Sequence, residues 1–167
     1  FPELELFHDV NENNKKIAEA IQEMWQKNLN IKVKLRSEEW KVYVSSRWRG
    51  EFTVCRGGWG GDYFDPRTML DLFTSYGINF CQWRWQPFAD RENDKTLNPA
   101  NKAYDEALIM STKTTGAERD KYLHEAENVL MEDAVIIPLY YYVDTYIVDN
   151  AKVKNVKQTT MGGWDFK

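Results

Sequence analysis

Residues 31–36 read Ile-Lys-Val-Lys-Leu-Arg, and this stretch decides the fold class. The alternation of apolar and basic side chains predicts a strand with one buried face. Before it, apolar side chains over residues 17–28 recur every three or four positions, which predicts a helix with capping residues at 11–14 and a stop at residues 28–30. After it, a second helix is expected from residue 37 or 38 to residue 49, where Gly50 closes it.

Two further strands flank this pattern, at residues 4–7 and 52–55. The order strand, helix, strand, helix, strand is typical of βαβ units in a parallel sheet. The chain is therefore predicted to be an α/β protein with a mostly parallel sheet flanked by helices.

The later part of the chain is predicted to be less regular. Residues 75–99 are rich in aromatic side chains and have no clear period, which is typical of a functional loop or a surface cover. Two helices are expected near residues 101–111 and 117–133. Residues 134–143 are predicted to form a buried strand, in which Pro138 indicates an edge position or a bulge.

The composition favours a globular ligand-binding protein over a nucleic-acid-binding one. Hydrophobic residues make up 43% of the 167 residues, enough for a packed core. The net charge of −4 does not suit nucleic acid, which requires a concentrated basic face. The 7 Trp and 9 Tyr suit a ligand cleft as well as a core. No apolar run approaches the ~20 residues of a membrane span, and the first residues lack a signal-peptide pattern, so any export signal is expected upstream.

The histidines and cysteines do not indicate a metal centre. His8 and His124 are isolated in the sequence, and no His, Cys or Asp spacing fits a metal site, so neither a metal nor a cofactor is expected. Cys55 lies in an apolar, strand-like run, where a buried free thiol is the commoner state, although a disulfide with Cys81 stays open.

Residues 56–66 read Arg-Gly-Gly-Trp-Gly-Gly-Asp-Tyr-Phe-Asp-Pro, between a predicted strand and a short predicted helix. Proteins with α/β folds bind ligands just beyond the carboxyl ends of their parallel strands. The four glycines allow the backbone to approach a ligand closely or to adopt positive φ. A phosphate-binding loop is excluded, because its Lys-Ser/Thr pair is absent and the glycine spacing fits no dinucleotide motif.

The two carboxylates of this segment have different interpretations. Asp65 is a good helix N-cap, with Pro66 at the first helical position. Asp62 has two open interpretations. It is either a turn residue that bonds its own backbone, or a carboxylate that receives the ammonium group of a ligand in a partly desolvated setting.

Five stretches resemble, in the same order, the extracellular oligopeptide-binding proteins, which are the peptide- and nickel-class (family 5) solute-binding proteins of ABC transporters. These stretches are NKKIA (14–18), WQKNL (25–29), EWK (39–41), RGGW with the Asp62-Tyr63 pair that follows it, and VIIPLYYYV (135–143). The resemblance covers most of the chain outside residues 80–98. It implies a lobe of the periplasmic-binding-protein-like (type II) fold that captures peptides for import and catalyses no reaction.

The resemblance also implies which residues bind the ligand. Asp62 matches the aspartate that receives the α-ammonium group of the peptide, and Arg56 matches an arginine near the path of its carboxylate. Trp59 and Trp40 match tryptophans that line the cleft. Arg47 lies at a polar position near the same pocket.

Three further positions belong to the implied site. Tyr63 follows the matched aspartate directly. Gly60 replaces a cysteine that some relatives carry, which removes any disulfide there. Asn14 replaces a histidine of close relatives, so a charge contact at this position would be lost or weakened.

Proteins of this family have two lobes that close over the ligand about a hinge. The resemblance implies that residues 1–167 form a single domain, the later part of the carboxy-terminal lobe, and that residues 145–167 return towards the amino-terminal lobe. The expected partners are a peptide, that other lobe and the membrane permease of an ABC transporter. The expected location is the periplasm or a lipid-anchored position at the cell surface. Without the opposing lobe, peptide binding is expected to be weak.

Two other classes of function stay open. A glycosidase would use Asp62 and Asp65 as facing carboxylates ~5 to 10 Å apart, although Asp65 is better explained as a cap. A carbohydrate- or protein-binding module would use the aromatic side chains of residues 80–88 as a stacking platform.

Overall fold

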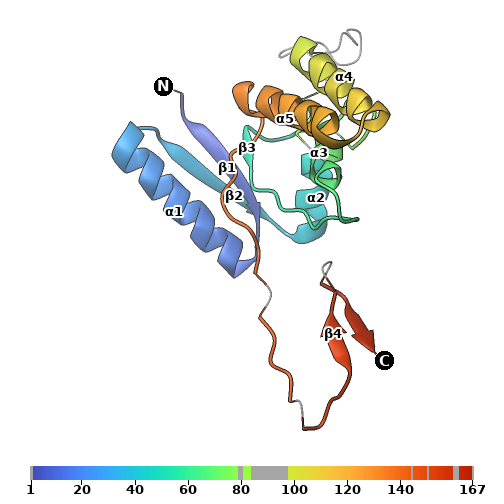
Figure 1. Cartoon of the computed structure of the whole chain (residues 1–167). Coiled ribbons are helices and arrows are strands. Elements are labelled where there is room, and N and C mark those ends of the chain that lie inside the picture. Colours follow the sequence, from blue (N-terminus) through green and yellow to red (C-terminus); the bar gives the residue numbers. More distant parts are fainter. Residues whose placement is uncertain are drawn as a thin grey trace.

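The computed structural model describes residues 2–78, 81–83, 98–143, 145–149, 151–159 and 162–166. The first half contains β1 (Leu4–Asp9), α1 (Glu12–Leu29), β2 (Val33–Glu38), α2 (Trp40–Trp48) and β3 (Val54–Cys55). Within the described residues, β1 lies between β2 and β3 and is parallel to both (Figure 1). The predicted α/β class with a parallel sheet is confirmed, and β3 is shorter than the sequence pattern suggested.

The first helix begins and ends where its capping residues predict. The Asn11 side chain accepts hydrogen bonds from the backbone N–H groups of Asn13 and Asn14, at 2.9 and 3.2 Å, which satisfies donors that have no partner inside the helix. At the other end Asn30 adopts a left-handed conformation with φ 54°, a common way for a helix to stop. Asn28, which the sequence pattern placed at the stop, is the second-last helical residue.

The two faces of the sheet are covered by different helices. Leu6 of β1 packs in one cluster with Ala18 of α1 and Val33 of β2. The next side chain, Phe7, points to the opposite face, as successive strand residues must. There its ring lies 4.8 Å from the ring of Tyr43 in α2. The Arg36 guanidinium carbon lies 3.6 Å from the Phe7 centroid. Phe7 is fully buried between these two groups.

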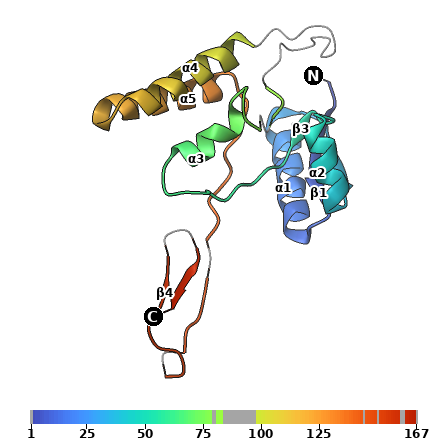
Figure 2. The same cartoon turned by 90° about the vertical axis from the view of Figure 1, so that its right-hand side faces the viewer.

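The second half of the chain builds a helical layer. It contains α3 (Arg67–Leu70), the 3₁₀ turn η1 (Asp71–Phe73), α4 (Pro99–Lys113) and α5 (Gly116–Glu132). The last two helices lie side by side (Figure 2) and confirm the two predicted helices. Their shared core is formed by residues of η1, α4 and α5: Leu72, Phe73, Tyr104, Leu108, Ala126 and Leu130.

The prediction of a buried strand at residues 134–143 is wrong. These residues form no strand, and Tyr141 is 97% exposed. Val135 and Ile136 pack against the helical core, but beyond them Pro138 lacks a backbone donor, and no described strand pairs with the segment. The chain then reaches a hairpin that the sequence pattern did not indicate. It consists of antiparallel β4 (Val156–Gln158) and β5 (Trp164–Phe166), and it stands away from the sheet (Figure 1).

Cys55 and Cys81 are both free thiols, which confirms the state expected for Cys55. Burial raises the pKa of both thiols, to about 11 for Cys81. Both are therefore protonated near neutral pH and are poor nucleophiles. In the part of the chain that the structure describes, no helix is long and apolar enough to cross a membrane.

Candidate ligand-binding site

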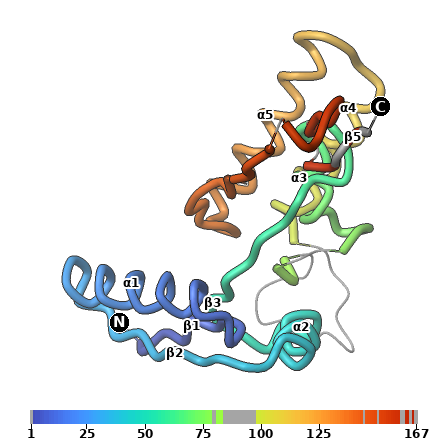
Figure 3. Tube along the Cα trace, turned by 90° about the horizontal axis from the view of Figure 1, so that it is seen from below, coloured from blue at the N-terminus to red at the C-terminus, as the bar shows by residue number. Residues whose placement is uncertain are grey.

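An open groove of about 1670 Å³ lies beside the sheet. Its walls come from one face of α1, from β3, from the glycine-rich segment that follows β3 and from residues 133–142. The segment after β3 runs from the sheet to α3 and so connects the two halves of the protein (Figure 3). Most of the lining side chains are apolar or aromatic, which suits a site that encloses a ligand of mixed chemistry.

The carboxyl ends of the three strands lie at the same edge of the sheet. Asn14 follows the end of β1, Trp40 follows β2, and Arg56 follows β3 directly. In parallel α/β sheets this edge is where ligands bind. The structure thus brings three of the predicted residues to one edge, although only Arg56 of these three also lines the groove.

Backbone hydrogen bonds fix Arg56 in place, and its guanidinium lies at the groove. Its N–H donates to the Phe7 carbonyl at 2.8 Å, which extends the pairing of β3 with β1, and its carbonyl accepts from the Tyr43 hydroxyl. The guanidinium donates to the Tyr142 hydroxyl and lies 6.0 Å from the centroid of that ring. A half-buried cation is therefore presented next to a hydroxyl group, an arrangement that can receive a carboxylate.

Tyr142 is a site residue that the sequence reasoning missed. Its ring and that of Tyr140 are 5.2 Å apart in an edge-on arrangement, and both side chains line the groove. The hydrogen bond between the two hydroxyls lowers the pKa of Tyr140 and raises that of Tyr142. The three consecutive tyrosines at 140–142 were the available signal, but the sequence assigned them to a buried strand.

Asp62 is exposed, and its neighbours Gly61 and Tyr63 line the groove. Its backbone N–H donates to the buried Thr68 hydroxyl at 2.9 Å. Its carboxylate makes no hydrogen bond or ion pair with any residue that the structure describes, so the self-bonded turn interpretation has no support. Asp62 itself is not among the described residues that line the groove, although both of its neighbours are.

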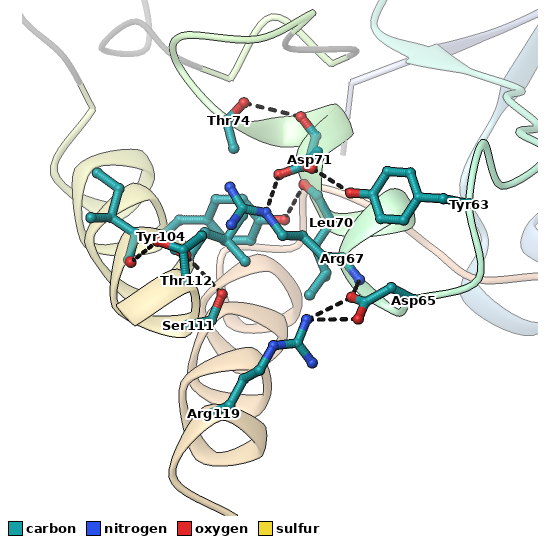
Figure 4. A network of polar contacts seen from close by, with 12 residues as sticks. Tyr63, Asp65, Arg67, Leu70, Asp71, Thr74, Tyr104, Ser111, Thr112 and Arg119 are labelled. Carbon is teal, nitrogen blue, oxygen red and sulfur yellow. Dashed lines mark hydrogen bonds and ion pairs between the residues drawn. The ribbon is translucent and has the colours of Figure 1, made fainter. Parts of the chain in front are cut away.

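Asp65 caps the start of α3, as the sequence predicted, but the helix begins one residue later than expected. Its Oδ1 accepts from the Arg67 N–H at 2.9 Å, and α3 begins at Arg67 rather than at Pro66. In addition, Arg119 Nη2 of α5 contacts both carboxylate oxygens, at 2.7 and 2.8 Å (Figure 4). A carboxylate committed to two partners is poorly suited to the glycosidase role.

Tyr63 is tied to the same network. Its hydroxyl donates to Asp71 Oδ2 at 2.8 Å, and Arg67 Nε donates to Asp71 Oδ1 at 2.9 Å (Figure 4). Burial, followed by the hydrogen bond to Asp71, raises the pKa of Tyr63 to about 12. Tyr63 is therefore a neutral side chain at the groove, fixed by α3 and η1.

We expect an Asp65→Asn variant to be less stable than the wild type by about 1 kcal/mol near neutral pH, because the amide keeps the cap but loses a partly exposed ion pair. The hydrogen bond from Arg67 and then the Arg119 guanidinium lower the pKa of Asp65 below 3.8. A lowered pKa stabilises the folded state above the unfolded-state pKa, and this stabilisation disappears as pH falls through the folded-state value. Urea denaturation from about pH 6 to about pH 3 should show the difference between the two proteins shrinking. A difference independent of pH would contradict the ion pair.

The remaining predicted residues divide into two groups. Arg47, Trp59 and Gly60 line the groove. The Arg47 guanidinium lies 5.4 Å from the ring of Tyr43, whose hydroxyl donates to the Arg56 carbonyl. Trp40 is exposed at the start of α2, outside the groove.

Asn14 is buried, and its side-chain amide donates to Asp9 Oδ1 at 2.6 Å. The structure therefore gives Asn14 a local role at the start of α1 and does not bring it to the groove.

Two other expectations concern metals and the aromatic platform. In the described ranges no cluster of His, Cys, Asp and Glu side chains could hold a metal ion. Of the predicted platform at residues 80–88, residues 81–83 alone are described, and the rest lies outside the described residues. Trp83 is buried in the helical core, where its indole N–H donates to Asp133, so this ring is not available for stacking.

Comparison with known proteins gives a consistent result. Residues 2–80 match the family model of the bacterial extracellular solute-binding proteins, family 5 (middle). The periplasmic murein peptide-binding protein MppA of Escherichia coli (strain K12) is 39% identical over 146 residues, which cover 87% of this chain and 24% of that protein. The oligopeptide-binding protein OppA of Bacillus subtilis (strain 168) is 31% identical over 162 residues, which cover 97% of this chain and 27% of that protein.

A solved structure extends the similarity to the fold. Haemophilus influenzae OppA in complex with the peptide RPPGFSPFR aligns with a TM-score of 0.69 at 35% identity, over 84% of this chain and 25% of that chain. The similarity confirms the predicted lobe of the periplasmic-binding-protein-like (type II) fold. The chain spans about a quarter of the length of these relatives. None of the three is a carbohydrate-binding protein, so they give the carbohydrate alternative no support.

Proposed function

Because the chain belongs to the bacterial extracellular solute-binding proteins of family 5, we propose that it captures peptides for import as part of one lobe of a two-lobe binding protein. Asp62 receives the α-ammonium group of the peptide, and Arg56, with Tyr142 beside it, lies near the path of the carboxylate. No bond of the ligand is made or broken.

One observation carries this proposal: a carboxylate that pairs with no described residue and a half-buried guanidinium stand on the same short segment. Asp62 follows Arg56 by six residues, so the two backbones cannot be more than about 20 Å apart. The two charges are opposite to those at the ends of a free peptide, and three extended residues span about 10 Å. The segment therefore suits a short zwitterionic chain better than an uncharged sugar.

The groove supplies the rest of the recognition. Trp59 and Tyr63 offer aromatic surface in the same groove, while the glycines leave room for the backbone of a ligand. Trp40 lies outside the groove, at the carboxyl edge of the sheet, where a second lobe could bring the peptide against it. Such a site would bind the ends of a peptide firmly and would accommodate varied side chains with water.

The remaining elements of the proposal concern partners and location. The exposed apolar and aromatic side chains at residues 137, 139–143, 146 and 147 provide a surface that a second lobe would cover, and residues 145–167 would lead the chain to that lobe. The closed, loaded protein would deliver the peptide to the membrane permease of an ABC transporter. It would work in the periplasm or on a lipid anchor at the cell surface.

Isothermal titration calorimetry on the full-length protein tests the proposal. A free tripeptide should bind, its N-acetylated and C-amidated forms should bind at least about tenfold more weakly because each leaves one buried charge unpaired, and maltose should not bind. Binding of maltose without binding of any peptide would instead favour the carbohydrate-binding alternative.

A further inference from the structure

The turn that carries Asp62 is anchored on both sides, although the Asp62 carboxylate has no partner within the described ranges. On one side, the Asp62 N–H is bound by the hydroxyl of Thr68, a buried residue of α3. On the other side, the Tyr63 hydroxyl is bound by Asp71 at 2.8 Å. Two residues further on, Asp65 is bound by Arg119. Three separate anchors within four residues leave the turn little freedom to move independently of the helices.

Arg119 differs from the other anchors because it comes from a distant part of the chain. It lies in the first turn of α5, 54 residues after Asp65, whereas Thr68 and Asp71 follow the turn closely. The pair is half-buried, with 26% of the arginine side chain and 32% of the aspartate side chain exposed. Arg119 points towards Asp65, away from α5 (Figure 4), and it is not among the described residues that line the groove. Its contact with the site is therefore made through Asp65.

We infer that the Arg119–Asp65 ion pair is a positioning device, which fixes the Asp62 carboxylate where the ammonium group of the peptide arrives. This inference rests on the proposed role of Asp62. An ion pair is strongest when its two charges already have the correct geometry, because the entropy of ordering a loop is then not lost on binding. The glycines before Asp62 would otherwise allow the turn many conformations. The ion pair between Arg119 of α5 and Asp65 restricts these conformations.

The test uses Arg119→Met in the full-length protein and two ligands, a tripeptide with a free amino terminus and its N-acetylated form. If Arg119 acts through Asp62, calorimetry should show the free peptide binding about tenfold more weakly, within the range measured for coupled neighbours. The acetylated peptide should be unaffected, because it lacks the ammonium group. In an Asp62→Asn background, Arg119→Met should then have no further effect on the free peptide.

Three variants make the result specific. Lys121→Met removes an exposed ion pair with Glu125 from the same helix and should change neither affinity. Asp65→Asn keeps the cap on α3 and should reproduce the effect of Arg119→Met, while Arg119→Lys keeps the charge and should recover part of the affinity. Both also serve if Arg119→Met fails to fold.

The outcomes are distinct. An equal loss for both peptides would show that Arg119 only stabilises the fold, and no loss for either would show that the turn is held without it; each overturns the inference. A wild-type protein that binds both peptides equally well would instead contradict the proposed role of Asp62, on which the inference rests.

Discussion

Replacing Asp62 by Asn should reduce the affinity of the full-length protein for a free peptide by about 2 to 5 kcal/mol, which is about 30-fold to several thousandfold. The amide keeps the shape of the side chain and the backbone bond to Thr68. The change therefore removes the negative charge and little else. The loss is large because the second lobe would exclude water from a pair that is exposed in the open state, and the ammonium group would remain without a partner.

Calorimetry with the free peptide and its N-acetylated form measures this loss. The acetylated peptide should bind the variant no more weakly than the wild type, because it has no ammonium group to lose a partner and the variant has no carboxylate left unpaired. Asp120→Asn, at an exposed position of α5, is the matched control and should leave both affinities unchanged. If Asp62→Asn kept the wild-type affinity for the free peptide, Asp62 would have to be removed from the site.

Replacing Phe7 by Ala should lower the free energy of unfolding by about 3 to 5 kcal/mol, the range for removing a buried aromatic ring. The ring is fully buried between Tyr43 and the Arg36 guanidinium. Its loss would leave a cavity at the centre of the sheet and remove the partner of Tyr43, whose hydroxyl holds the carbonyl of Arg56. We therefore expect the variant to be less stable and the Arg56 guanidinium to be held less firmly at the groove.

Urea denaturation followed by tryptophan fluorescence measures the change. Phe64→Ala is the matched control, since Phe64 is 82% exposed, and it should alter stability by no more than about 0.5 kcal/mol. Equal losses in the two variants would mean that the Phe7 ring is not packed as the structure shows.

The first half of the fold could be predicted because its signals are local. The alternation at residues 31–36 and the caps at Asn11 and Asn30 depend only on neighbouring residues, and the order of elements then fixed a parallel sheet. The prediction of a strand at residues 134–143 was wrong for the opposite reason. Their β-branched and aromatic side chains indicate a surface that fits a sheet, but a strand also needs a neighbour, and no described strand supplies one.

The candidate site shows the same division. Arg56 and Asp62 were found because they share one glycine-rich segment. Tyr142 and Arg119 were not found, because they reach that segment from 86 and 54 residues away, and no local pattern records such contacts. Asn14 was placed in the site through the resemblance, but its amide is committed to Asp9.

The exposed apolar side chains at residues 137, 139–143, 146 and 147 have a consequence for how the protein folds. Tyr141 and Ile147 are 97% and 98% exposed, and residues 134–143 carry no charge. An uncharged segment of high β propensity is a template for aggregation when it is left uncovered. Under the proposed two-lobe arrangement, the same contact that completes the cleft would also hide this segment. Folding of the two lobes would then be thermodynamically coupled. The solubility of the protein, like its capture of peptides, would depend on the assembly of the two lobes.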